Sequence, residues 1–300
     1  MNRLSLIILF IYLLALPSCI DDVNLTIDNA ESRISFYCEF EPGKVVSFKY
    51  ATATGLSDLL EPIAPTTTSE FDITFKQNGT EIDPAFRYNP ITGYFDAQIQ
   101  TFPVEQGSFY DVSTELHELP EIGKAEGTTY VPMAKEFSSL DLLELNKTGE
   151  ESGFNLQMKA RFTIDAVSPY YEVEIFTRSI INSRIVDVPL DFALVNKQVG
   201  VLELEHRNSL LIDSKKNKGQ YVTVLIDDSV SETALEFSDN VFFKLKTINE
   251  HHYYFHENLA KRIESVNAPI SEPVIYYTNM DNGLGLFSGY SSVTDTISIK

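Results

Sequence analysis

Three histidines near the carboxyl end, His251, His252 and His256, are the residues most suited to metal chemistry. On a β-strand, His252, Tyr254 and His256 would share one face, and two imidazoles with a nearby carboxylate can hold zinc or copper. The order of residues does not match the H-E-x-x-H arrangement of zinc hydrolases. We therefore expect an aromatic strand with solvated histidines that leads into a helix, and no metal site. Metal binding by His252 and His256 is the alternative.

Acidic and glycine-rich patterns elsewhere lack the spacing of known catalytic or cation sites. Asp227-Asp228 and Asp239-Asn240 do not follow the calcium-loop pattern D-x-[DN]-x-[DN]-G, and turn chemistry explains them better. No glycosidase pair stands out among the 43 acidic residues, and the chain has no tryptophan to stack on a sugar. Gly283-x-Gly285 is not a phosphate loop and indicates positive φ or close backbone packing. These patterns predict no catalytic residue and no cofactor.

Cys19 lies in a motif with a defined chemistry. It ends the segment Leu16-Pro17-Ser18-Cys19, which follows an uninterrupted apolar run over residues 6–16. The run is shorter than the roughly 20 residues of a membrane span and is typical of a secretory signal. The segment resembles the bacterial lipobox, in which the thiol becomes a diacylglyceryl thioether and the chain is cut before the cysteine. We expect residues 1–18 to be a lipoprotein signal peptide and Cys19 to carry the lipid anchor, with acyl chains such as palmitate.

An acidic pair follows Cys19, and the chain as a whole is acidic. Asp21 and Asp22 resemble the acidic export signal that sends lipoproteins of the Bacteroidota to the outer face of the outer membrane, and residues 19–30 are then a lipidated tether. The formal net charge of the chain is −20, which would repel nucleic acids and anionic membrane surfaces. We expect an outer-membrane protein, held by its lipid and facing the cell exterior, with no nucleic-acid partner.

Cys38 has no cysteine partner once Cys19 carries the lipid, because the chain contains only two cysteines. It lies on the same alternating apolar phase as Ile34, Phe36 and Phe40. We expect a buried small hydrophobic side chain, and no disulfide.

Short apolar alternations of period two, separated by turn residues, predict a mainly all-β chain. The first half has about seven such strands, as in an immunoglobulin-like sandwich, and its strongest hairpin signal is Asn78-Gly79. We expect an immunoglobulin-like β-sandwich over residues 31–131, closed by the segment 123–132.

A second antiparallel β-rich domain is predicted over residues 132–300. Its longest alternation runs from Phe154 to Ile164, and Tyr171–Ile175 resumes after Pro169 in what we expect to be the antiparallel neighbour. One short C-terminal helix is predicted over Glu257–Val266, because apolar residues recur there at helical spacing. Further strands are expected over 190–195, 199–205, 220–226 and 241–248.

The segment Pro273–Tyr290, which contains Asn279 and then Gly283-Leu284-Gly285-Leu286-Phe287, resembles the closing segment of a Bacteroidota lipoprotein family, domain-of-unknown-function family 4249. The lipobox, Pro42-Gly43, Thr129–Pro132 and Tyr170-Tyr171 agree in order, so the resemblance covers nearly the whole chain. Asn282 stands where a glycine pair is commoner in the family, and asparagine also tolerates positive φ. The resemblance implies a surface lipoprotein associated with TonB-dependent outer-membrane transporters, and it implies no catalytic activity.

The leading hypothesis is a non-enzymatic accessory or ligand-capture partner of a TonB-dependent transporter. A surface hydrolase is one alternative, and it would have a deep cleft lined by two carboxylates of raised pKa. An adhesive or structural surface module is another, and it would present a flat exposed patch without a pocket.

Overall fold

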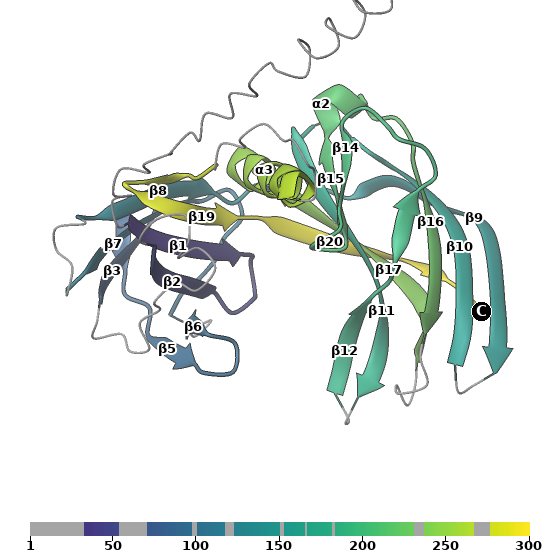
Figure 1. Cartoon of the computed structure of the whole chain (residues 1–300), viewed down its shortest axis with the longest axis horizontal. Helices are drawn as coiled ribbons and strands as arrows, with labels where there is room; N and C mark the ends of the chain where they lie inside the picture. Colours follow the sequence, from purple (N-terminus) through teal and green to yellow (C-terminus); the bar gives the residue numbers. More distant parts are fainter. Residues whose placement is uncertain are drawn as a thin grey trace, which may run out of the picture. The chain divides into compact units, whose positions relative to one another are not determined.

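The computed structural model is mainly β, which confirms the predicted fold class (Figure 1). It describes residues 33–53, 71–97, 101–117, 123–150, 153–165, 167–181, 184–230, 237–266 and 277–300, all within one compact unit of residues 31–300. The predicted signal peptide, Cys19, Asp21, Asp22 and the predicted tether lie outside the described residues. No helix among the described residues has the length and apolarity to cross a bilayer.

Two five-stranded sheets form the first sandwich. Sheet A has the order β19-β1-β2-β6-β5, with β1 at Arg33–Phe40, β2 at Ser47–Ala53, β5 at Phe86–Asn89, β6 at Tyr94–Ala97 and β19 at Gly283–Gly289. Sheet B has the order β18-β8-β7-β3-β4, with β3 at Phe71–Gln77, β4 at Thr80–Ile82, β7 at Phe109–Leu116, β8 at Ala125–Tyr130 and β18 at Met280–Asp281. Both sheets contribute to one core, which is rich in phenylalanine.

Period-two alternation produces this core, as predicted. Every second residue of β1 is buried, including Cys38, which is free and fully buried. Desolvation raises the pKa of the Cys38 thiol above its usual range, so the thiol is an inert apolar group. The predicted hairpin at Asn78-Gly79 joins β3 to β4, and both residues have positive φ.

The C-terminal glycine motif completes the first sandwich. Strand β19 pairs in parallel with β1, so the yellow strand lies beside the purple one (Figure 1). Gly285 has a φ of +112° and faces Phe36, which confirms the predicted close backbone packing. The Asn279 amide accepts from the Phe287 N–H and donates to the Phe287 carbonyl, so it pairs with Phe287 as a strand would. Asn282 has positive φ, as the sequence predicts.

The segment 123–132 does more than close the first sandwich, because it contains strand β8. Ala125, Gly127 and Thr129 are the buried residues of this strand. These side chains are too small and too polar to give an apolar alternation, so the sequence analysis missed the strand. Strand β18, from the predicted second domain, pairs with β8, so segments from both predicted domains build sheet B.

The second sandwich also has two sheets around one core. Sheet C has the order β13-β16-β10-β9, with β9 at Phe137–Glu150, β10 at Gly153–Ile164, β13 at Phe192–Leu194 and β16 at Val222–Val230. Sheet D has the order β14-β15-β11-β17-β20, with β12 paired to β11. Its strands are β11 at Tyr170–Ile181, β12 at Arg184–Pro189, β14 at Val201–Leu204, β15 at Ser209–Asp213, β17 at Phe237–Ile248 and β20 at Ser291–Ser298. A single helical turn, α2 at Ser214–Asn217, follows β15.

The predicted pairing of the Phe154–Ile164 and Tyr171–Ile175 strands is wrong. Strand β10 lies between β9 and β16, whereas β11 pairs with β12, β15 and β17 in the other sheet. Both strands bury an alternating face in the same core, and alternation alone does not say which sheet a strand joins. The strands expected over 190–195, 199–205, 220–226 and 241–248 are present as β13, β14, β16 and β17.

The C-terminal helix is longer than predicted. Helix α3 runs from Glu250 to Val266, so the expected aromatic strand at 251–256 is its first half. Asn249 caps the helix, because its side-chain oxygen accepts from the His252 N–H at 3.0 Å. The cap and the packing of His252, His256 and Ala260, one turn apart on a buried face, outweigh the β-propensity of the aromatic residues.

Candidate functional site

Helix α3 brings two histidines against two glutamates from distant strands. His252 and His256 have fully buried and 2% exposed side chains, and Glu39 and Glu172 come from β1 and β11. The sequence analysis expected solvated histidines, and this prediction is wrong. The helix turns both imidazoles inward, whereas a strand would have placed Tyr254 on the same face.

Glu172 is the most enclosed acid of the cluster, with no exposed side-chain surface. It accepts from Arg207 Nε at 3.0 Å, Lys246 Nζ at 3.2 Å and Ser209 Oγ at 2.7 Å. His252 Nε2 lies 2.9 Å from its second oxygen. Burial alone would raise the pKa of Glu172, but the charges of Lys246 and Arg207 and the contact with His252 hold that pKa well below its usual range.

Glu39 is held by a two-point ion pair. Arg207 donates from Nη1 and Nη2 to the two carboxylate oxygens, each at 3.0 Å, and Tyr37 donates its hydroxyl at 2.7 Å. His256 Nε2 lies 2.6 Å from Oε1. Burial would raise the pKa of Glu39, but His252, Arg207 and the contact with His256 hold it well below its usual range. Burial lowers the pKa of His256 to about 4 against the opposing effect of Glu39.

These groups belong to a larger set, which we call the buried charge network: Glu39, Glu41, Glu172, Glu174, Arg207, Lys244 and Lys246. Contacts within 4 Å connect all seven, and Glu172–Lys246 and Glu174–Lys244 are cross-strand pairs of β11 and β17. Four carboxylates face three cations, so the network carries a net charge of −1. It connects the outer face of sheet A to sheet D, and helix α3 contacts it through His252 and His256.

Asn249 makes a second connection between helix α3 and the first sandwich. Its Nδ2 donates to Thr129 Oγ1 at 2.8 Å and lies 3.1 and 3.2 Å from the carbonyls of Tyr130 and Gly289. The same side chain caps the helix through Oδ1. One amide therefore fixes the start of α3 against β8 and β19.

We expect Asn249→Ala to lower the free energy of unfolding by about 2 kcal/mol, because the helix loses its cap and the buried acceptors lose their donor. The control is Asn258→Ala, on the same helix, whose exposed amide donates to the Tyr254 carbonyl one turn earlier. That change should stay within roughly 0.5 kcal/mol. Urea denaturation followed by circular dichroism measures both, and equal losses would contradict the role given to Asn249.

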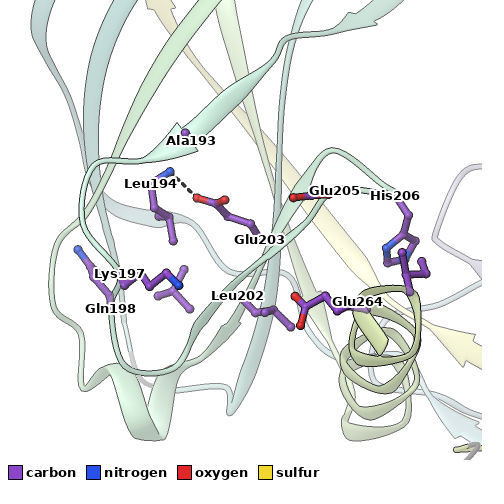
Figure 2. Close-up of a pocket in the computed structure, with 12 residues that line it drawn as sticks. Ala193, Leu194, Lys197, Gln198, Leu202, Glu203, Glu205, His206 and Glu264 are labelled. Carbon is purple, nitrogen blue, oxygen red and sulfur yellow. Dashed lines mark hydrogen bonds between the residues drawn. The ribbon is translucent and has the colours of Figure 1, made fainter. Parts of the chain in front are cut away.

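A pocket of about 480 Å³ opens beside the network, between helix α3 and the β13–β14 segment (Figure 2). Its apolar lining includes Leu194, Leu202 and Ala260, and its rim carries charged groups. In Figure 2, Glu203 accepts a hydrogen bond from the Leu194 N–H, and Glu264 of the helix points toward Leu202. The remaining lining residues are Ala193, Lys197, Gln198, Val201, Glu205, His206 and Ile263.

His206 and Arg207 are adjacent in the turn after β14, but one belongs to the pocket and the other to the buried charge network. Arg207 enters the buried charge network, while His206 lines the pocket and stacks on His256 with ring centroids 6.0 Å apart. Burial and the neighbouring charge of Arg207 lower the pKa of His206. The pocket therefore presents apolar side chains, three carboxylates and one lysine to a ligand.

The sequence analysis missed the acids and bases of the network. Glu39 lies on the outward phase of β1, where the strand pattern alone predicts a solvated carboxylate. In the structure, helix α3 covers this position. A signal was nevertheless present, because Glu172-Val173-Glu174 and Lys244-Leu245-Lys246 carry opposite charges at the same spacing. Such strands favour each other as neighbours, and β11 and β17 are paired in this register.

Comparison with known proteins gives one strong result. A family model described as "Domain of unknown function (DUF4249)" matches residues 20–296. Among curated proteins, none matches the chain. Three solved structures overlap it weakly: a chimeric titin Z1Z2-Z1Z2 tandem, Rst D1-D2 and β-glucuronidase 3 of Bacteroides uniformis in its apo form.

The identities of these structures to the chain are 12%, 8% and 9%, and the TM-scores are 0.19, 0.20 and 0.21. The matches cover 72%, 73% and 72% of this chain and 89%, 92% and 23% of the other chains. TM-scores this low establish neither a shared fold nor a shared activity.

Proposed function

This chain belongs to the family described as domain of unknown function (DUF4249), and we propose that it is a lipid-anchored protein of the outer-membrane surface. In this proposal it acts without catalysis, as an accessory or ligand-capture partner of a TonB-dependent transporter. The observation that carries the proposal is Cys19 at the end of a lipobox-like segment, with Asp21 and Asp22 directly after it. Two acyl chains at about 0.8 kcal/mol per buried methylene hold such a protein at the membrane permanently.

The pocket beside helix α3 supports the ligand-capture part of the proposal. Its volume of about 480 Å³ lies within the range of small-molecule sites, and its lining contains both apolar and charged side chains. A flat adhesive module would have no need of such a concavity.

The pKa values of the two buried carboxylates Glu39 and Glu172 do not suit a general acid. A general acid needs a raised pKa, as in acid-catalysed hydrolases, whereas the pKa values of Glu39 and Glu172 are both lowered. Their charges are directed at Arg207 and Lys246 and hold the fold together. The proposal therefore assigns them a structural role.

The partner is tested by co-purification. An affinity-tagged full chain, expressed in a bacterium of the Bacteroidota, is cross-linked, extracted from the outer membrane in detergent and purified. Mass spectrometry should then recover a TonB-dependent barrel protein in amounts comparable to the tagged chain. Recovery without a barrel protein, from membranes that contain such transporters, would contradict the transporter partnership.

The anchor is tested separately by Cys19→Ser. We expect the unchanged chain to fractionate with the outer membrane and to be accessible to added protease on intact cells. The variant has no thiol to acylate, so it should lose lipid labelling by a fatty-acid probe and leave the outer-membrane fraction. Cys38→Ser is the matched control, because Cys38 is buried and should keep both lipid label and location. A labelled Cys19→Ser variant would contradict the anchor.

A further inference from the structure

Glu39, His252 and His256 can each place one ligand atom within 4.8 Å of the others. We propose that these three residues bind a divalent transition-metal ion, of which zinc is the best match. Two imidazoles and one carboxylate are a ligand set that zinc uses with three protein ligands, the fourth position being filled by water. The inference is independent of the transporter partnership. The sequence analysis left metal binding by His252 and His256 with a nearby carboxylate as the alternative, and the structure brings Glu39 to these two histidines.

His252 provides the first argument. Its Nε2 lies 2.9 Å from Glu172 Oε2, so a hydrogen on Nε2 donates to that carboxylate. The other ring nitrogen, Nδ1, then holds a lone pair, yet it is fully buried and has no hydrogen-bond partner among the described residues. Glu39 Oε1 lies 3.8 Å from it. A metal ion between these two atoms would give the buried Nδ1 lone pair the partner that it lacks.

The contact with Glu172 supplies the second argument. Histidines that bind metals commonly donate their other N–H to a carboxylate, which fixes the ring and makes the ligating nitrogen more basic. Glu172 accepts from His252 in this way, and it is itself held by Ser209 and Lys246. The orientation of the His252 ring is therefore fixed before any ion arrives.

His256 faces Glu39 from the next turn of the helix. Its Nε2 lies 2.6 Å from Glu39 Oε1 and 3.1 Å from Arg207 Nη1, which itself donates to Glu39 Oε1 at 3.0 Å. Two ligands on one zinc ion lie roughly 3.4 Å apart, so an ion would open the His256–Glu39 contact by about 0.8 Å.

The surrounding charge tolerates an added cation. Arg207 repels an ion at this position, but it is already paired with Glu39 and Glu172. The whole buried charge network carries a net charge of −1, and the carboxylates of Glu39 and Glu172 lie on either side of His252. The attraction of both carboxylates acts at short range in a buried environment, where screening by solvent is weak.

The test uses the full chain purified in detergent, stripped with a chelator and then dialysed against zinc or cobalt. We expect elemental analysis to give one zinc ion per chain. The cobalt-loaded chain should show the absorption bands of a four-coordinate site. His256→Gln should weaken zinc binding by at least about 100-fold, since even the loss of an outer-shell partner costs 10–100-fold. His117→Gln is the control, because His117 is exposed and contacts Asp72 in sheet B. It should bind zinc as the unchanged chain does.

X-ray absorption at the zinc edge of the unchanged chain tests the same assignment without a variant. It should show two imidazoles and a carboxylate oxygen around the ion. Sub-stoichiometric zinc after dialysis would overturn the proposal, and a proton on His252 Nδ1 would then satisfy the same geometry. Undiminished binding by folded His256→Gln, or a zinc spectrum without imidazole, would overturn it as well.

Discussion

Replacing Glu172 with alanine is expected to lower the free energy of unfolding by about 3–5 kcal/mol, the cost of breaking a buried ion pair by removing one partner. Glu172 accepts from Arg207, Lys246 and Ser209 at once. Lys246 is almost completely buried, with 3% of its side chain exposed, so it cannot turn to water when its partner is lost. Glu174 remains beside it and recovers only part of the lost attraction.

Two further variants separate the causes of this loss. Glu172→Gln keeps the shape of the side chain and an acceptor for Ser209 but removes the charge. Its free energy of unfolding should therefore lie between those of the unchanged chain and Glu172→Ala. Glu205→Ala removes an exposed acid from the turn after β14 and should change stability by less than roughly 0.5 kcal/mol. Urea denaturation is followed by tyrosine fluorescence, since the chain has 15 tyrosines and no tryptophan. A Glu172→Ala loss as small as that of Glu205→Ala would show that the network does not stabilise the fold.

Gly285→Ala is expected to cost about 4 kcal/mol or more, in the range reserved for severe steric or backbone conflict. A Cβ at this position would lie 2.1 Å from the Phe36 carbonyl oxygen and 2.9 Å from its carbon. Both atoms belong to the backbone of β1, which pairs with β19 at this register. The clash can be relieved only by separating the two strands, and β19 would then leave the edge of sheet A.

Gly43→Ala is the matched control for Gly285→Ala. Gly43 also has positive φ, at +76°, but nothing lies within 4 Å of an added Cβ. Its substitution should cost only the conformational strain of an L-residue there, about 1–2 kcal/mol. Thermal unfolding followed by circular dichroism compares the two. Equal losses would mean that strain, and not contact with Phe36, makes glycine necessary at position 285.

Local patterns predicted much of the fold because a half-buried strand alternates between apolar residues on its buried face and polar residues on its solvated face. Buried residues alternate along β1 and β10 as predicted, the Asn78-Gly79 turn forms the hairpin, and the Gly283-x-Gly285 motif packs closely. Strand β8 was missed because Ala125, Gly127 and Thr129 are small, so their burial left no apolar pattern. The partner of β10 was wrong because alternation identifies a buried face and says nothing about the neighbouring strand.

The sequence by itself determined the lipobox-like segment at Cys19, the acidic balance, the mainly β fold and the inert, buried Cys38. Only the tertiary structure decided the site. Glu39 is separated from His256 by more than 200 residues. The local sequence alone predicts a solvated position for Glu39 and an aromatic strand for His256. Helix α3 covers the outer face of β1 and excludes water from both, and this burial converts ordinary polar residues into an ion network with a candidate metal site.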